Sequence, residues 1–258
     1  MSGSRFGSVM LAVTLRRFRH FLRNPAISVP YFAMPLLFLA FGGGGLSNVG
    51  NLPAFDFPSG YTAFYFAFVV LLGAAFTGAA TGDAIAADFE SGFARRLLLA
   101  APHRASVGAG YVLASVTLAL VLMLFLTAVA VAAGMNVDGN ALELVGLYGL
   151  GVLLTVVSSL WAAGFALRTR IMQAQAGARI AIFLSLMLSP AFVPRPLLSD
   201  WLRAAADYNP YTAILESSRG LISGQPDETA FAYLIALGLI IGFSAWAVTG
   251  LRLALRST

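Results

Sequence analysis

Six long apolar runs constrain this chain more than any other feature of its sequence. They lie near residues 26–46, 61–82, 106–134, 143–167, 178–194 and 230–251, and none has a charged residue in its middle. A helix of about 20 apolar residues crosses the roughly 30 Å hydrocarbon core of a bilayer. The chain is 59% hydrophobic and only 10% charged, so one soluble core could not hide this apolar surface. We therefore expect an all-α membrane protein with six transmembrane helices.

The distribution of arginine predicts the orientation of these spans. Six spans place both termini on one side of the membrane, and the segments on that side carry 13 arginines against three on the other side. Short cytoplasmic segments are the ones that concentrate basic residues. We expect cytoplasmic termini and a multi-pass protein of the inner or plasma membrane.

Missing residue types exclude several kinds of chemistry. All 16 basic residues are arginine, so the lysine of a phosphate-binding ATPase loop is absent. The chain has no cysteine and only two histidines, and no carboxylate pair or nucleophile–base set is recognisable. We expect no catalytic, metal or cofactor site in this chain. Its charges form short clusters between apolar runs, which does not suit nucleic-acid binding.

Residues 1–24 predict an amphipathic helix in the membrane interface. One side of the helical wheel carries Leu11, Leu15, Phe18 and Leu22. The opposite side carries Arg16, Arg19, His20 and Arg23, and the candidate interface residues are Arg16, Arg17, Arg19 and Arg23. Such a helix buries its leucines in the acyl boundary and holds its arginines near anionic headgroups. Asn24-Pro25 should end it before the first span.

The connection between the second and third spans, residues 83–104, predicts an amphipathic cytoplasmic helix that ends at a proline. Its candidate functional residues are Asp88, Glu90, Gly92, Arg95, Arg96 and Pro102. A functional interpretation makes this helix the lever on which a cytoplasmic motor acts. A solvated loop with interfacial charges is the alternative interpretation.

The outward segment 190–229 should contain short helices before the last span, because prolines break the fifth apolar run. The stretches 201–206 and 213–221 have helical character. Asn209-Pro210 suits a helix start, and Glu216 could pair with Arg219 one turn apart. These four residues form either a capped helix or a gating element.

Aromatic residues crowd the outer part of the second span, among them Tyr61, Phe64, Tyr65 and Phe68. Rings at this depth usually form an interfacial belt. The alternative is that some of them line a transport pathway, where flat ring faces suit drugs or sugars.

Three of these elements, in their order along the chain, resemble the permeases of type-2 ABC transporters. The family includes exporters of antibiotics, nodulation factors and cell-surface polysaccharides. The matching stretches are Leu15–Pro25, Asp88–Pro102 and Asn209–Leu221. One departure is the small run Gly108-Ala109-Gly110, where the family usually has a basic residue.

The resemblance implies a single transmembrane domain over residues 1–258 that pairs with a second permease copy, usually identical. Two nucleotide-binding ATPase subunits would bind ATP and Mg²⁺ and would contact the interface helix and the coupling helix around Glu90 and Gly92. We expect a permease, not an enzyme, that exports an amphiphilic cargo such as a drug, antibiotic or lipid. Export of a polysaccharide or lipid-linked glycan is the alternative, and a secondary transporter or channel is the alternative from a different class.

Overall fold

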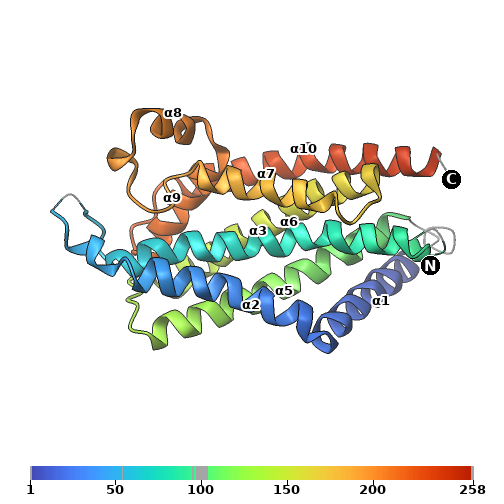
Figure 1. Ribbon diagram of the computed structural model, residues 1–258, viewed down its shortest axis with the longest axis horizontal. Helices are drawn as coiled ribbons and strands as arrows, with labels where there is room; N and C mark the ends of the chain where they lie inside the picture. The colour runs from blue at the N-terminus through green and yellow to red at the C-terminus, as the bar shows by residue number, and fades with distance from the viewer. Residues whose placement is uncertain (1, 54, 95, 97–103, 257–258) are drawn as a thin grey trace.

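The computed structural model describes residues 2–53, 55–94, 96 and 104–256, and this part of the chain contains helices and no strands. The long elements are α1 (Ser2–Arg23), α2 (Pro25–Phe38), α3 (Gly60–Glu90), α5 (Arg104–Ala132), α6 (Ala141–Thr169) and α10 (Thr229–Arg256). The shorter α-helices are α7 (Gln175–Met187), α8 (Asp200–Tyr208) and α9 (Pro210–Ile222). Single turns follow α2 as η1 (Leu39–Gly44) and η2 (Ser47–Asn51), and η3 (Arg195–Leu197) precedes α8. The start of α1 and the end of α10 lie at the same end of the molecule (Figure 1).

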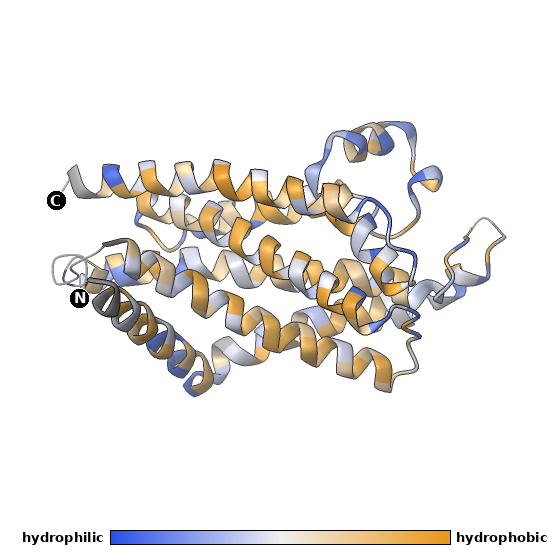
Figure 2. Ribbon diagram, turned by 180° about the vertical axis from the view of Figure 1, so that it is seen from behind, coloured by the Kyte–Doolittle hydropathy of each residue, from blue (hydrophilic) through white to orange (hydrophobic). Residues whose placement is uncertain are grey.

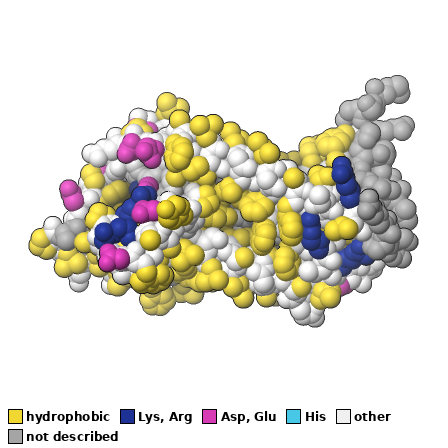
Figure 3. Space-filling model, turned by 90° about the horizontal axis from the view of Figure 1, so that it is seen from above, with side chains coloured by type: hydrophobic (Ala, Val, Ile, Leu, Met, Phe, Trp, Pro, Cys, Tyr) yellow, Lys and Arg dark blue, Asp and Glu magenta, His cyan; other side chains and the backbone are white. Residues whose placement is uncertain are grey.

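Five helical stretches are long and apolar enough to cross a membrane. They are Ser28–Asn51, Gly60–Glu90, Ala105–Ala132, Ala141–Thr169 and Thr229–Ala254, and they correspond to five of the six predicted spans. Figure 2 shows the hydrophobic residues along these helices, and Figure 3 shows the hydrophobic face between two charged ends.

The predicted span 178–194 is shorter than the sequence suggested. Helix α7 has 13 residues and ends at Met187, and the proline-containing stretch that follows is irregular. At 1.5 Å per residue this helix is about 20 Å long, less than the hydrocarbon thickness of about 30 Å. The structure therefore does not confirm a sixth full span.

Helix α3 forms the centre of the bundle, and α10 lies at its edge. Helices α2, α5, α6, α7 and α9 all pack on α3, and its large rings and leucines are buried on every side. By contrast α10 packs mainly on α6 and α9 and leaves Phe231, Leu234 and Ile241 exposed. Exposed apolar side chains on a spanning helix face lipid, so α10 belongs to the outer surface of the bundle.

The contact between α3 and α6 depends on small residues. A Cβ atom on Gly78 would lie 2.8 Å from Cβ of Ser158 and 3.0 Å from the backbone nitrogen of Ser159. One turn further, the hydroxyl of Thr81 lies 2.7 Å from that of Ser115 on α5 and donates to Ser159 at 3.2 Å. Small residues let helix backbones approach closely in a membrane, and hydroxyls then join the helices.

The predicted interface helix and outer helices are both present. Helix α1 ends at Arg23 and α2 begins at Pro25, as expected for a break at Asn24-Pro25. Leu11, Leu15 and Leu22 remain exposed on α1, available to the membrane. Helices α8 and α9 cover the predicted stretches 201–206 and 213–221 and extend beyond them.

Candidate functional site

The end of α3 near the chain termini is bonded to α1 and α5. Arg16 of α1 donates from both terminal nitrogens to the carboxylate of Asp88, and the hydroxyl of Tyr111 on α5 donates to the same carboxylate. The guanidinium of Arg16 also lies 4.2 Å from the ring centre of Phe93. One carboxylate therefore fixes the relative positions of three helices.

The neighbouring acidic residues connect α3 to the segment between α6 and α7. A carboxylate oxygen of Glu90 accepts a 2.8 Å hydrogen bond from the backbone nitrogen of Met172. Asp83 forms a 2.5 Å ion pair with Arg179 of α7. Asp83, Asp88 and Glu90 together attach α1, α5 and the α6–α7 connection to a single helix end, which we call the α3 hub.

The predicted coupling segment 83–104 begins as the last part of α3, and after a turn at Ser91-Gly92 the residues Phe93, Ala94 and Arg96 are again helical. Helix α3 runs without a break to Glu90, because Asp83–Glu90 continue its apolar and small-residue packing. A turn follows in which Gly92 has a positive φ of 70°, a conformation that glycine adopts without strain. Gly92 is exposed and Arg96 is exposed. Arg95 and Pro102 lie outside the described residues.

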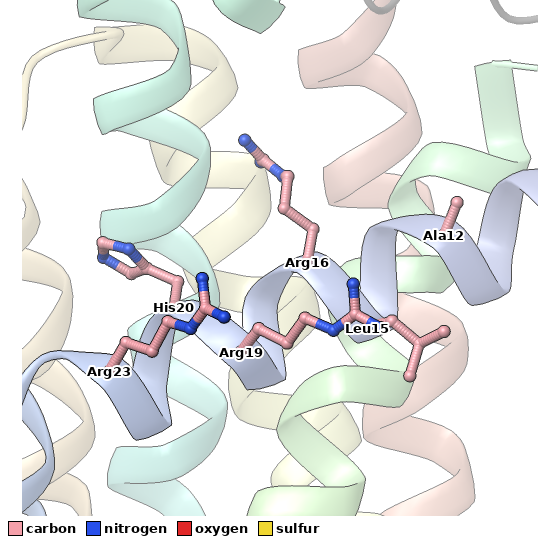
Figure 4. Close-up of a pocket in the computed structure, with 6 residues that line it drawn as sticks. All are labelled: Ala12, Leu15, Arg16, Arg19, His20 and Arg23. Atoms are coloured by element: carbon pink, nitrogen blue, oxygen red, sulfur yellow. The ribbon is translucent and has the colours of Figure 1, made fainter.

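The basic residues of α1 divide into two groups. Arg16 and Arg17 turn toward the bundle, where Arg17 donates to the carbonyl of Ala80 at 3.4 Å. Arg19 and Arg23 are exposed, together with His20, and Figure 4 shows these side chains gathered along α1. The predicted interface face is therefore half occupied by contacts within the protein.

Helix α1 is seated on α5 at a glycine whose role the sequence did not reveal. A Cβ atom on Gly110 would lie 2.7 Å from Cβ of Val13 and 2.8 Å from the carbonyl oxygen of Met10. The hydroxyl of Thr14 donates to the carbonyl of Gly110 at 3.0 Å. Gly110, in the run 108–110 that departs from the family pattern, is thus the contact for α1, and its small size was the signal for a close approach.

Arg219 of α9 is buried at the opposite end of the molecule. It donates to the carbonyl oxygens of Phe64 at 3.1 Å and Ala191 at 3.0 Å, and it lies 3.4 Å from the ring centre of Phe64. Burial lowers the pKa of its guanidinium to about 9, and the nearby Glu216 and Tyr61 oppose that shift. The side chain is therefore a cation at neutral pH that holds α3 and the loop after α7 together.

The predicted pairing of Glu216 with Arg219 is wrong. Glu216 instead accepts two hydrogen bonds from Arg195, which also pairs with Asp207 at 3.2 Å. The physical reason is geometric, since Arg219 points into the bundle while Glu216 stays half-exposed toward η3.

Asn209 and Pro210 begin α9 as predicted. The side-chain oxygen of Asn209 accepts from the backbone nitrogen of Tyr211 at 3.1 Å, with Pro210 at the first helical position. The amide nitrogen of Asn209 donates to the carbonyl of Ser185 on α7 at 2.6 Å. The cap therefore also joins two helices, which the sequence did not predict.

The aromatic residues of the second span lie inside the bundle and not in an interfacial belt. Tyr61, Phe64, Tyr65 and Phe68 are all buried. They pack on one another and on Phe55, Phe57 and Phe192. Their burial reflects the central position of α3, which hydropathy alone could not distinguish from an outer helix.

Within the described residues, no group of three or more His, Cys, Asp or Glu side chains could hold a metal ion. Apart from Glu216 on the short helix α9, the acidic residues of the sequence lie in connections or near helix ends. The polar side chains that do cluster join helices to one another at the two ends of the bundle.

Comparison with known proteins identifies the family. A search of curated proteins finds no match to the chain. The family model of the ABC-2 type transporter membrane domain matches residues 8–222, which includes α1, the α3 hub and α9. The chain belongs to the ABC-2 type transporter family and is a transmembrane permease component, not the ATPase of such a transporter.

Proposed function

We propose that this chain is the permease subunit of an ATP-driven exporter that moves an amphiphilic cargo such as a drug, antibiotic or lipid. Two copies, taken to be identical, would enclose the pathway, and two partner ATPase subunits would bind ATP and Mg²⁺. The family implies association with an ABC ATPase partner. Export, cargo class and homodimer formation are part of the proposal.

The observation that carries this proposal is the α3 hub. A force applied next to Gly92 reaches α1 through Asp88 and Arg16, and it reaches the α6–α7 connection through Glu90. The same helix continues through the centre of the bundle to Gly60 at the other end. A rigid central helix that is displaced at one end can change the packing at its other end.

The arginine distribution supports placing the hub in the cytoplasm, where an ATPase would dock. Arg16, Arg17 and Arg96 lie around the hub, and the charged side chains at that end of Figure 3 are mostly basic. Basic residues at a membrane boundary mark its cytoplasmic side. The termini lie at the same end as the hub (Figure 1), so the proposal makes both of them cytoplasmic.

The absence of mid-helix acids favours ATP-driven transport over proton coupling. Proton relays in transporters use buried acidic or histidine side chains within the spans. In the part of the chain that the structure describes, no acidic residue occupies the middle of a long helix. Transport that continued after ATP depletion would support a secondary transporter or channel instead.

Two exposed glycines give a matched test of coupling. Gly92 has φ 70° at the hub, and Gly134 has φ 92° beyond the other end of α5. A Cβ atom at either position would have no other atom within 4 Å, so alanine at either position adds only backbone strain, about 1–2 kcal/mol. We expect Gly92→Ala to weaken cargo-stimulated ATP hydrolysis by the reconstituted complex and Gly134→Ala to leave it unchanged.

The assay is ATPase activity of the co-purified complex with and without a panel of amphiphiles. Equal yields of both variants would show that insertion is intact. Equal stimulation in both variants, or equal loss in both, would contradict the role of the hub in coupling. A response to lipid-linked glycans but to no drug or lipid would favour the glycan-export alternative.

A further inference from the structure

A groove of about 540 Å³ lies between α5 and α10, and the proposed transport mechanism does not use it. Both helices pack on α6, which lies between them (Figure 1 and Figure 2). The floor is formed by residues of α6 such as Val156 and Leu160, and the walls include Gly108 and Val116 of α5 and Ile240 and Val248 of α10. Tyr111 of α5 and Ser244 of α10 are the only hydroxyl-bearing residues among the lining side chains, and the others are apolar.

The length of the groove matches one leaflet of a bilayer. Its wall on α5 runs from Ala105 to Val116, and its wall on α10 runs from Ile240 to Leu251. Eleven helical steps of 1.5 Å make each wall about 17 Å long, roughly half of the 30 Å hydrocarbon core. The groove starts near the hub end, where α5 begins, and stops near mid-membrane.

The hub end of the groove is basic. Two guanidinium groups lie against groove residues at that end: that of Arg170 is 5.8 Å from the ring centre of Phe89, and that of Arg17 is 5.9 Å from the ring centre of Tyr111. Arg96 and Arg252 follow the lining residues Ala94 and Leu251 within two positions in the chain. Arg96 and Arg252 are exposed.

The acidic residues nearest to this end of the groove are hydrogen-bonded to other parts of the protein. Asp88 is bonded to Arg16 and Tyr111, and Glu90 is bonded to the backbone of Met172. Arg16 balances the charge of Asp88, and the exposed Arg96 and Arg252 together outweigh the single charge of Glu90, so the net charge at the mouth of the groove favours an anion.

We propose that the groove binds one anionic phospholipid of the hub-side leaflet, with an acyl chain against α6 and the phosphate near Arg96 and Arg252. If the groove were empty within the hydrocarbon, the atoms that line it would lack van der Waals contacts on one side. An acyl chain has the polarity and the one-leaflet length to restore those contacts. Basic clusters at the cytoplasmic boundary attract anionic headgroups, which selects the lipid class. This binding requires neither ATP nor export.

Native mass spectrometry tests the proposal. The full-length chain is mixed in detergent with phosphatidylglycerol or phosphatidylcholine, and the lipid that stays bound after release from detergent is measured. We expect phosphatidylglycerol to be retained in preference. Gly108→Leu places a side chain in the groove, and no atom lies within 4 Å of a Cβ built at that position. It should displace at least two methylene groups of the lipid and weaken retention about tenfold.

Gly242→Leu is the matched control, because Gly242 is exposed on α10, is free of atoms within 4 Å and does not line the groove. We expect it to retain lipid as the unsubstituted chain does. The double variant Arg96→Gln with Arg252→Gln should reduce the preference for phosphatidylglycerol about 30-fold. Arg19→Gln with Arg23→Gln removes the same charge from the exposed face of α1 and should leave the preference unchanged.

Three results would overturn the proposal. The first is equal retention of the two lipids, and the second is unchanged retention in Gly108→Leu or equal loss in Gly242→Leu. The third is a shift between one-chain and two-chain assemblies in Gly108→Leu alone, which would assign the groove to a second copy of the chain. All of these readings are made without nucleotide, so they are independent of whether the complex exports a cargo.

Discussion

Replacing a single glycine by alanine should have opposite effects on stability at two positions of this bundle. Gly78 lies in the α3–α6 contact, where a Cβ atom would be 2.8 Å from Cβ of Ser158. Carbon atoms pack best at about 3.5–4.0 Å, so the helices must separate by about 1 Å at this point. Gly238 on α10 has no atom within 4 Å of a Cβ position, and alanine there meets no obstacle.

The magnitudes follow from these two environments. Overpacking a close contact costs about 1–3 kcal/mol, and a separation of that size also breaks the 3.2 Å bond from Thr81 to Ser159, worth about 0.6 kcal/mol in a membrane. The gain in helix propensity, up to about 1 kcal/mol, offsets part of the loss in Gly78→Ala. In Gly238→Ala that gain is the only effect, so the two variants should differ by about 2–3 kcal/mol.

Equilibrium unfolding in mixed micelles with increasing SDS measures this difference. We expect the midpoint to fall for Gly78→Ala and to stay or rise for Gly238→Ala. A midpoint for Gly78→Ala equal to or above that of Gly238→Ala would refute the close α3–α6 contact.

Two further predictions concern the polar contacts at the two ends of the bundle. A double-mutant cycle with Arg16→Gln and Asp88→Asn should give a coupling free energy of about 1–2 kcal/mol, because the two side chains are 39% and 15% exposed; additive effects on the unfolding midpoint would show that the pair contributes nothing. Arg219→Lys keeps the charge but cannot reach both carbonyls with one ammonium, so we expect a loss of about 1–3 kcal/mol, checked by the same unfolding measurement. A midpoint equal to that of the unsubstituted chain would contradict the two-carbonyl geometry.

The sequence predicted most of the helices because their signals are local. Apolar runs of spanning length, the break at Asn24-Pro25 and the start of α9 at Asn209 each depend on residues close in the chain. The fifth predicted span, 178–194, is longer than the helix found there. Hydropathy counts all of these residues as apolar, but the helix ends at Met187, before the prolines. Hydropathy averages over residues that differ in backbone preference.

Tertiary position was not available from the sequence. The burial of Tyr61 and Phe64 depends on α3 being surrounded by other helices, and every span has similar hydropathy. The partners of Glu216 and Arg219 depend on how η3 and α9 pack, so their spacing of three residues suggested a pair that the fold does not form. Roles assigned to Arg95 and Pro102 stay predictions.

The proposed transmission of motion depends on where the polar contacts of the bundle lie. Between the ends, α3 packs through glycine and hydroxyl contacts that admit only small changes in spacing. At the ends, Asp88 and Arg219 hold α3 to segments outside the span, at the hub and at the loop after α7. A displacement of the hub would therefore move α3 as one body, because close-packed interiors resist gradual deformation. Under the proposed function, the far end would then respond through the contacts that Arg219 makes with Phe64 and Ala191.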